Sequence, residues 1–182
     1  MKKLALVVVD VLNDFVTGAI GCDNAKAVIQ PLVTLTEEAR KHNIPVIYTN
    51  DAHIEGIDKE LSLWGDHALE GSEGAQVVPE LTPQKGGFLV PKRRYSGFFQ
   101  THMDLLLREL GVDTLIVTGL YVHLCCRMTC ADAYNLGYGL IIPRETMAAF
   151  PNDDYEAGLT YLKECFGAEI CSLEEAIDMI RG

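Results

Sequence analysis

Apolar runs recur along most of the chain and are separated by amphipathic segments. The first run, residues 4–11, is continuous and rich in Val, which is typical of a strand buried on both faces of a sheet. Five shorter runs also have strand character, and most of the segments between them have helical spacing. The predicted strands comprise residues 4–11, 45–49, 87–90, 114–118, 138–142 and 168–172. The predicted helices comprise residues 31–42, 99–110, 124–136, 153–166 and 173–180.

This alternation predicts a three-layer α/β/α fold, Rossmann-like, with a mostly parallel central sheet of about six strands. A chain of 182 residues without internal repeats or linkers suits a single domain, residues 1–182. Residues 50–86 are irregular and rich in Gly, Pro and acidic side chains. A connection of this length in a compact domain is usually functional or disordered, and we expect this one to contribute to function.

Polar side chains follow four of the predicted strands. They are Asp10, Asp51 with His53, Lys92 and Cys125. Ligands of parallel α/β sheets bind at the carboxyl ends of the strands, so we expect these residues to meet in one site. Taken singly, Asp10 is better explained as a loop cap and Lys92 as a solvated loop residue. The joint placement of acid, cation and thiol favours a catalytic site.

Composition and charge restrict the classes of partner. The net charge of −11 and the pI near 4.8 argue against nucleic acid and anionic membrane, which are bound by excess Lys and Arg. No apolar run approaches the roughly 18 residues of a membrane span. The basic and apolar start resembles a signal peptide, but Asp10 interrupts it and no small-residue cleavage site follows. We therefore expect a cytoplasmic protein.

Three of the six cysteines lie close together, at Cys125, Cys126 and Cys130. Their spacing matches no paired zinc-finger pattern, and free thiols are expected in a cytoplasmic chain. Cys126, Cys130 and Ala133 share one helical face, which predicts a face packed on the sheet. Cys125 lies at the helix start, where the helix dipole and a nearby ammonium such as Lys92 would stabilise a thiolate. Cys125 is therefore the candidate nucleophile.

Three motifs resemble those of the isochorismatase-like cysteine hydrolases, a superfamily that includes nicotinamidases and N-carbamoylsarcosine amidases. They are VVVDVLNDF, KRRYSGF and VTGLYVHLCCRMTCADAYNLGY, and the resemblance covers nearly the whole chain. It implies an Asp10, Lys92 and Cys125 triad in an isochorismatase-like hydrolase fold. Asp10 would act as general base and Lys92 would favour the thiolate. Cys125 would attack an amide carbonyl to give a thioester that water hydrolyses.

The resemblance also implies an oxyanion hole and a metal site. The backbone N–H groups of Tyr121 and Cys125 would bind the oxyanion, next to a cis peptide bond between Leu120 and Tyr121. The metal ligands would be a carboxylate and two imidazoles, with a further carboxylate as an optional fourth: Asp51, His53, His67 and Glu60. Zinc is favoured, and iron or manganese also suits these ligand types. The metal would orient the pyridine nitrogen of nicotinamide.

Several residues near the implied pocket bear on the substrate. Leu12, Val122 and His123 stand where relatives often have Gln, Thr and Asp. The candidate pocket residues are Phe15, Trp64, Arg94, Tyr95 and His123. An inward-facing arginine, Arg93 or Arg94, would bind a substrate carboxylate. Taken alone, the arginines are better explained as surface or subunit-interface residues, and the aromatic residues could equally belong to the core or to an interface.

The leading functional prediction is hydrolysis of a small-molecule amide, nicotinamide, to nicotinate and ammonia. One alternative is hydrolysis of an N-carbamoyl amino acid by the same triad. The other is a metal-binding or partner-binding family member without turnover. The resemblance further implies a homo-oligomer, a dimer or a tetramer.

Overall fold

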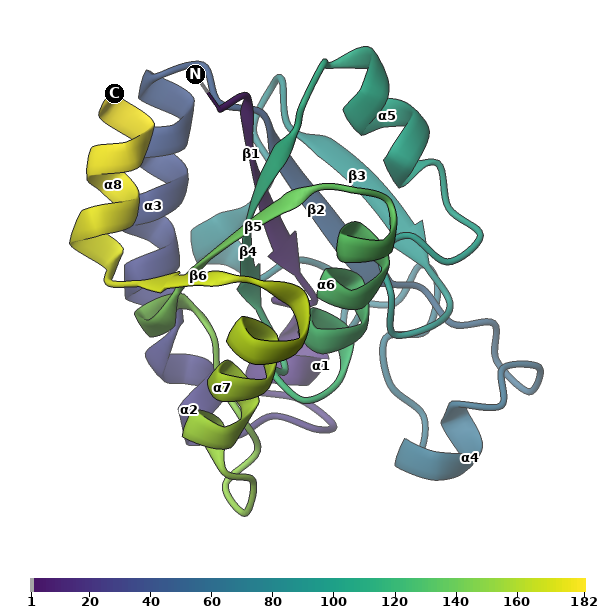
Figure 1. The fold of residues 1–182 in the computed structure, drawn as a ribbon. Helices are drawn as coiled ribbons and strands as arrows, with labels where there is room; N and C mark the ends of the chain where they lie inside the picture. The colour runs from purple at the N-terminus through teal and green to yellow at the C-terminus, as the bar shows by residue number, and fades with distance from the viewer. Residues whose placement is uncertain (1) are drawn as a thin grey trace.

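A six-stranded parallel sheet forms the centre of the computed structural model, which describes residues 2–182 (Figure 1). The strand order is β3-β2-β1-β4-β5-β6, and every neighbouring pair is parallel. The strands are β1 (Leu4–Val9), β2 (Val46–Asp51), β3 (Phe88–Lys92), β4 (Thr114–Gly119), β5 (Gly139–Pro143) and β6 (Glu169–Cys171). The predicted fold class is confirmed.

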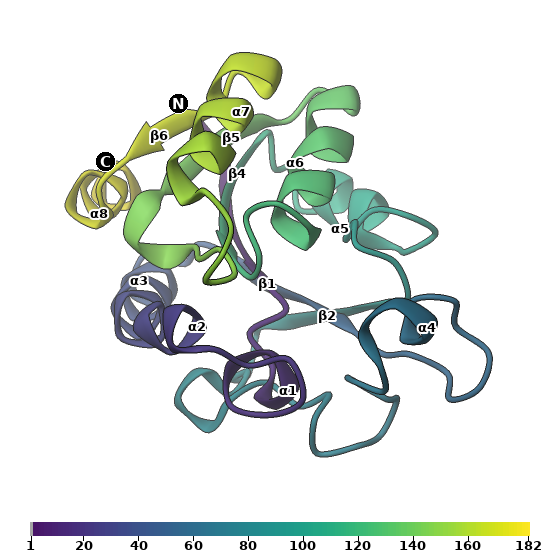
Figure 2. The same cartoon turned by 90° about the horizontal axis from the view of Figure 1, so that it is seen from below.

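Helices cover both faces of this sheet (Figure 2). One face carries α1 (Asn13–Val16), α2 (Asp23–Ala27), α3 (Ile29–Lys41) and α8 (Leu173–Arg181). The other face carries α5 (Met103–Glu109), α6 (Cys125–Asn135) and α7 (Tyr155–Phe166). The remaining short elements are α4 (Leu61–Trp64) and the 3₁₀ turns η1 (Pro79–Leu81) and η2 (Arg144–Thr146). None of the described helices is both long and apolar enough to cross a membrane.

Each face of β1 belongs to a different hydrophobic core. Leu4, Leu6 and Val8 pack in the core beneath α3 and α8, whereas Val7 and Val9 pack in the core beneath α5, α6 and α7. Successive side chains of a strand point to opposite faces, so a central strand needs apolar residues at every position. This requirement explains the continuous run at the start of the sequence.

Several element boundaries differ from the predicted ones. Strands β2 and β3 extend to Asp51 and Lys92, beyond the predicted ends at residues 49 and 90. Helix α5 begins at Met103, four residues later than predicted, because the preceding residues form turns. The extensions matter for the site, because they place two of its charged side chains on the sheet itself.

Candidate active site

Four buried side chains meet at the carboxyl edge of the sheet. The Lys92 Nζ lies 2.7 Å from Asp10 Oδ2, 2.6 Å from Asp51 Oδ1 and 3.6 Å from Cys125 Sγ. All four residues are 2% exposed or less. They come from the ends of β1, β2 and β3 and from the start of α6. The structure thus brings together the acid, cation and thiol that the sequence singled out.

Asp51 belongs to this cluster through both its backbone and its side chain. Its amide N–H donates to Asp10 Oδ1 at 2.7 Å, while its carboxylate accepts from Lys92. The register of β2 and β3 places Asp51 directly beside Lys92. Asp51 therefore holds Asp10 and Lys92 in place while its second carboxylate oxygen stays free.

The charges of this cluster act on its titratable groups. Burial, together with the negative charge of Asp51, raises the pKa of Asp10 to about 6, although Lys92 opposes the shift. Burial and the charge of Asp10 raise the pKa of Cys125 well above its ordinary value, and the opposing effect of Lys92 is smaller. The direction of this shift favours the protonated thiol, which suits the expected role of Asp10 as the base that would accept the thiol proton.

Cys126 and Cys130 pack in the core beneath α6, as predicted from their shared face. Both are fully buried, and the Cys126 thiol contacts the Thr118 carbonyl at 3.8 Å. Burial raises the pKa of Cys130 to about 12, so this thiol is neutral and inert. Cys125 is the cysteine of this group that meets the charged cluster.

The backbone before Cys125 has the predicted cis peptide bond between Leu120 and Tyr121. Gly119, just before it, has a φ of 107°, and a Cβ there would lie 2.1 Å from the Val9 carbonyl oxygen. Within residues 2–182, neither the Tyr121 amide nor the Cys125 amide donates a hydrogen bond to the protein. Two buried backbone donors therefore remain free beside the thiol.

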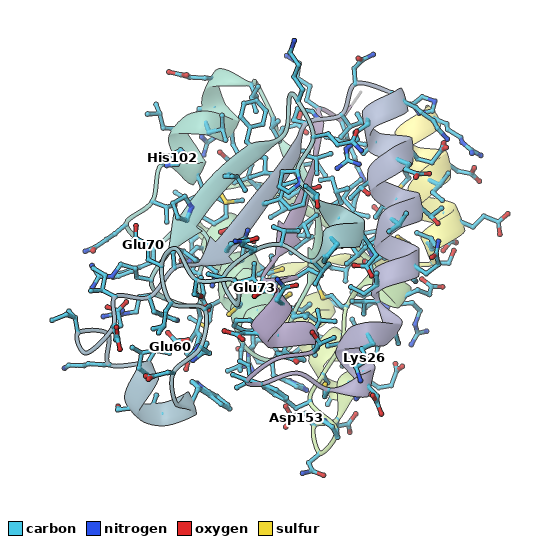
Figure 3. All side chains as sticks on the ribbon, turned by 180° about the vertical axis from the view of Figure 1, so that it is seen from behind. Lys26, Glu60, Glu70, Glu73, His102 and Asp153 are labelled. Carbon is cyan, nitrogen blue, oxygen red and sulfur yellow. The ribbon has the colours of Figure 1, made fainter. Side chains whose placement is uncertain are left out.

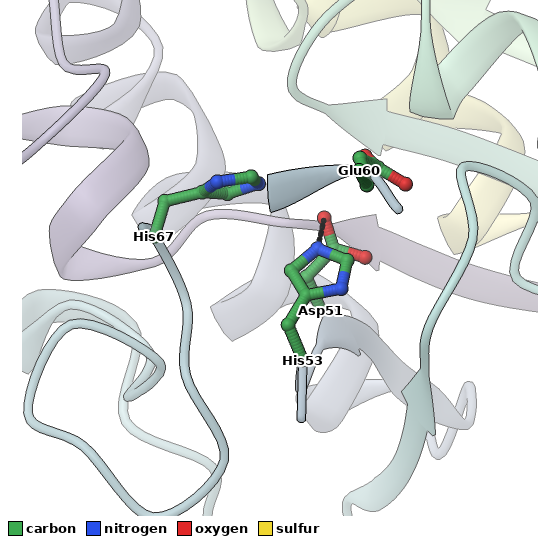
Figure 4. A group of neighbouring side chains, drawn as sticks. All are labelled: Asp51, His53, Glu60 and His67. Atoms are coloured by element: carbon green, nitrogen blue, oxygen red, sulfur yellow. Dashed lines mark ion pairs between the residues drawn. The ribbon is translucent and has the colours of Figure 1, made fainter. Parts of the chain in front are cut away.

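A second cluster adjoins the first and shares Asp51 with it (Figure 4). One ligand atom from each of four side chains lies within 4.8 Å of the others; the four are Asp51, His53, Glu60 and His67. Glu60 comes from the segment that carries α4, beyond the carboxyl edge of the sheet (Figure 3). All four residues are buried.

The state of these ligand atoms tests whether the cluster suits a metal ion. His53 Nε2 and Asp51 Oδ2 lie 3.6 Å apart, and both are buried without a hydrogen-bond partner. Burial and the charge of Asp51 raise the pKa of Glu60 to about 7, although His53 and Lys92 oppose the shift. Two imidazoles and two carboxylates form a common donor set for zinc, iron or manganese. The residues therefore fit a divalent metal.

The outer nitrogens of both imidazoles are already engaged. His53 Nδ1 lies 3.2 Å from Asp58 Oδ2, and His67 Nδ1 lies 2.8 Å from the Gly65 carbonyl oxygen. Each acceptor favours the tautomer with a proton on Nδ1, which leaves the Nε2 lone pair for a metal. Sequence reasoning missed Asp58, because no spacing pattern links it to His53.

A small aromatic pocket of about 10 Å³ opens over the thiol. Its lining is Phe15, Ile20, Glu60, Trp64, His67, Tyr95, Tyr121, Leu124, Cys125 and Phe150. Phe150 stacks on Tyr121 with ring centroids 3.9 Å apart and on Trp64 at 5.7 Å. The Trp64 indole N–H donates to the Tyr95 hydroxyl at 3.2 Å. Sequence reasoning missed Phe150, which lies in an irregular segment outside every recognised motif.

Two predicted pocket residues, Arg94 and His123, are not part of this lining. Arg94 is half-exposed and donates to the Arg93 carbonyl, with its guanidinium 3.7 Å from Asp58. His123 lies against α7, where a Cβ at Gly158 would be 2.8 Å from its ring. The Arg94 guanidinium is held outside the pocket by Asp58 and by the Arg93 carbonyl. The His123 ring is held by its close packing against α7.

The chain matches known proteins over nearly its full length. Residues 4–175 match the model of the isochorismatase domain. The isochorismatase family protein YwoC of Bacillus subtilis is 32% identical over 88% of this chain and 86% of its own. Two solved structures also match. N-carbamoylsarcosine amidase from Thermoplasma acidophilum is 34% identical, with a TM-score of 0.89 over 96% of this chain and 98% of its own. Nicotinamidase PncA from Bacillus subtilis is 30% identical, with a TM-score of 0.88 over 93% of this chain and 99% of its own. The protein belongs to the isochorismatase family of hydrolases.

Proposed function

We propose that the protein is a cysteine amidohydrolase that converts nicotinamide to nicotinate and ammonia. The observation that carries this proposal is the contact of one buried ammonium, Lys92, with the Cys125 thiol and with two carboxylates. Asp10 is the proposed base of this triad. Asp51 connects the triad to the cluster of metal-ligand side chains.

In the proposed reaction, the Cys125 sulfur attacks the amide carbonyl carbon while Asp10 takes the thiol proton. One carboxylate oxygen of Asp10 and the Cys125 sulfur lie within 4.8 Å, close enough for transfer after a small movement. Asp10 then gives this proton to the leaving nitrogen, ammonia departs and a thioester remains. Water activated by Asp10 hydrolyses the thioester, which releases the acid and restores the thiol.

The free amides of Tyr121 and Cys125 are the proposed donors to the tetrahedral oxyanion. Both residues are buried, so the donors need no further desolvation when negative charge develops on the carbonyl oxygen. A donor of this kind contributes roughly 10²–10³ in rate. Lys92 stays protonated, because Asp10 and Asp51 raise its pKa despite its burial. Its positive charge would stabilise the anion, whether the negative charge is on the Asp10 carboxylate or on the Cys125 sulfur.

A divalent metal would be held by the His53 and His67 imidazoles, Asp51 and Glu60. When bound, it would supply a Lewis-acidic position that a heteroaromatic ring nitrogen can occupy. The same pocket offers mainly aromatic surface, from Phe15, Trp64, Tyr121 and Phe150. Aromatic walls with a few polar groups suit a flat, uncharged ligand such as nicotinamide, which would enter as these side chains move apart, because the space between them is only about 10 Å³.

An N-carbamoyl amino acid is the second candidate substrate, favoured by the similarity to the Thermoplasma acidophilum N-carbamoylsarcosine amidase. Its carboxylate needs a cation, and no arginine or lysine is part of the pocket lining. Arg93 and Arg94 are both directed at Asp58. The pocket chemistry therefore favours nicotinamide.

The test is ammonia release by the purified protein with added manganese or zinc, with Cys125→Ala as the blank. We expect release from nicotinamide by the wild type alone. Release from N-carbamoylsarcosine but not from nicotinamide would replace the proposed substrate. No release from either compound would leave metal or partner binding without turnover as the function to pursue.

A further inference from the structure

Asp58 is a buried carboxylate at which the metal-ligand cluster and a surface arginine meet. Its side chain is 1% exposed, whereas the side chain of Arg93 is 47% exposed. It accepts from the Ile54 amide at 3.0 Å and from Arg93 Nε at 3.1 Å, with a second close contact to the same guanidinium. Its Oδ2 also faces His53 Nδ1 at 3.2 Å. The guanidinium of Arg93 supplies the positive charge that a buried carboxylate needs.

We infer that Asp58, held by Arg93, is a positioning residue that fixes the ring orientation and tautomer of His53 for metal binding. The inference rests on the metal site of the proposed function. An ionised carboxylate can only accept hydrogen bonds, so the His53 nitrogen that faces it carries the proton. The other nitrogen, Nε2, then presents its lone pair toward Asp51 Oδ2, 3.6 Å away.

His53 and Arg93, which both contact Asp58, differ in their burial. His53 has no exposed surface, and neither Nε2 nor Asp51 Oδ2 has another partner among the described residues. Arg93 is the first residue after β3, which ends at Lys92, and its side chain extends to Asp58. The arginine thus connects the sheet to the irregular segment that carries both His53 and Asp58. Without this ion pair, the carboxylate would be buried and unpaired, which is costly.

Arg94 provides a matched control within the same sequence. Its guanidinium is as exposed as that of Arg93, but it lies 3.7 Å from Asp58 and donates to a backbone carbonyl instead. Arg93→Gln should therefore weaken the hold on Asp58 far more than Arg94→Gln, because Arg93 hydrogen-bonds this carboxylate and Arg94 makes only the longer ion pair. Asp58→Asn keeps an oxygen that can accept from His53 Nδ1, so it should retain more function than Asp58→Ala.

The experiment measures zinc affinity by chelator competition, together with the ¹⁵N chemical shifts of the histidine rings. Loss of an outer partner of a metal ligand typically lowers metal affinity by about 10–100-fold. We expect a loss in this range for Asp58→Ala, smaller losses for Asp58→Asn and Arg93→Gln, and less than a twofold change for Arg94→Gln. In Asp58→Ala, the His53 shifts should also move away from the Nδ1–H tautomer.

Equal zinc affinity in Asp58→Ala and the wild type would overturn the inference, as would equal losses in the two arginine variants. A wild type that binds neither zinc nor manganese would overturn it too. Tight, Asp58-dependent metal binding without ammonia release would support the positioning role and contradict only the proposed substrate. Arg93→Gln alters an exposed side chain, so it remains informative if Asp58→Ala does not fold.

Discussion

Lys92 lies at the centre of the buried charged cluster of the candidate site. A buried ammonium is tolerated only when its charge is paired and its donors are used, and here two carboxylates and a thiol surround it. The residue types at the strand ends could be predicted, because the alternation of strands and helices places them on one edge. The shared role of Asp51 could not, because it depends on the register between β2 and β3.

The adjacent cysteines give the clearest residue-scale prediction. Cys125→Ala should abolish hydrolysis and leave the fold intact, because the nucleophile is lost while the charged cluster remains. Cys126→Ala should keep most of the activity and lower the free energy of unfolding by roughly 1 kcal/mol, because it leaves a small cavity in the core. Ammonia release and urea unfolding measure the two effects. Activity in Cys125→Ala together with inactivity in a folded Cys126→Ala would show that Cys126, and not Cys125, is the nucleophile.

At the scale of elements, the boundaries that bear on the site were the hardest to predict. The third predicted strand ended at residue 90, directly before Pro91. However, β3 is the edge strand, where a missing N–H on the unpaired side costs nothing, and the strand continues to Lys92. The four-residue helix α4 was missed, because one turn is too short to show a helical period. The contact of Asp58 with Arg93 joins residues 35 positions apart, which no local pattern reveals.

Gly65, the residue that ends α4, connects this element to the metal-ligand cluster. Its φ of 77° and ψ of 178° define a conformation that only glycine adopts readily, and its carbonyl accepts from His67 Nδ1. Gly65→Ala should therefore misplace the His67 ring and lower zinc affinity, with a destabilisation of about 1–3 kcal/mol. Chelator competition and thermal unfolding measure the two effects.

Gly56→Ala is the matched control for this substitution. Gly56 also has a positive φ, 69°, and its added Cβ would likewise meet nothing within 4 Å. Among residues 2–182, its carbonyl accepts no hydrogen bond from a ligand histidine. Gly56→Ala should destabilise the protein without an equal loss of zinc affinity. Equal affinity losses in both variants would mean that the backbone of the segment, and not the contact with His67, determines metal binding.

At the scale of the whole molecule, the two cores consist mostly of residues outside the candidate site, which they meet at Phe15, Tyr121 and Cys125. The cores fill the two faces of the sheet, whereas the site occupies the carboxyl edge and the irregular segment that follows β2. None of the four metal-ligand side chains belongs to either core, so we expect the fold to form without a metal. A metal that binds only the folded protein should nevertheless stabilise the whole domain, because binding and folding are linked.

Manganese addition should therefore raise the melting temperature in proportion to its affinity for the folded protein. At a hundred times its dissociation constant, a ligand adds about 2.7 kcal/mol of stability. Each kcal/mol raises the melting temperature of a domain of this size by about 2–4 °C, so the shift should be roughly 5–11 °C. Manganese is preferable to zinc here, because the six cysteines of the unfolded chain would bind zinc and reduce the effect.

His67→Ala tests whether this shift comes from the candidate site. The substitution removes one ligand from the lining of the pocket, and His67 is not itself a member of either core. Without metal, the variant should melt within a few degrees of the wild type, and most of the shift with manganese should be lost. A full shift in the variant would place manganese elsewhere on this acidic protein, whose net charge of −11 attracts cations without a defined site. A wild-type shift that disappears in 0.5 M salt would lead to the same conclusion, since salt screens diffuse attraction far more than direct coordination.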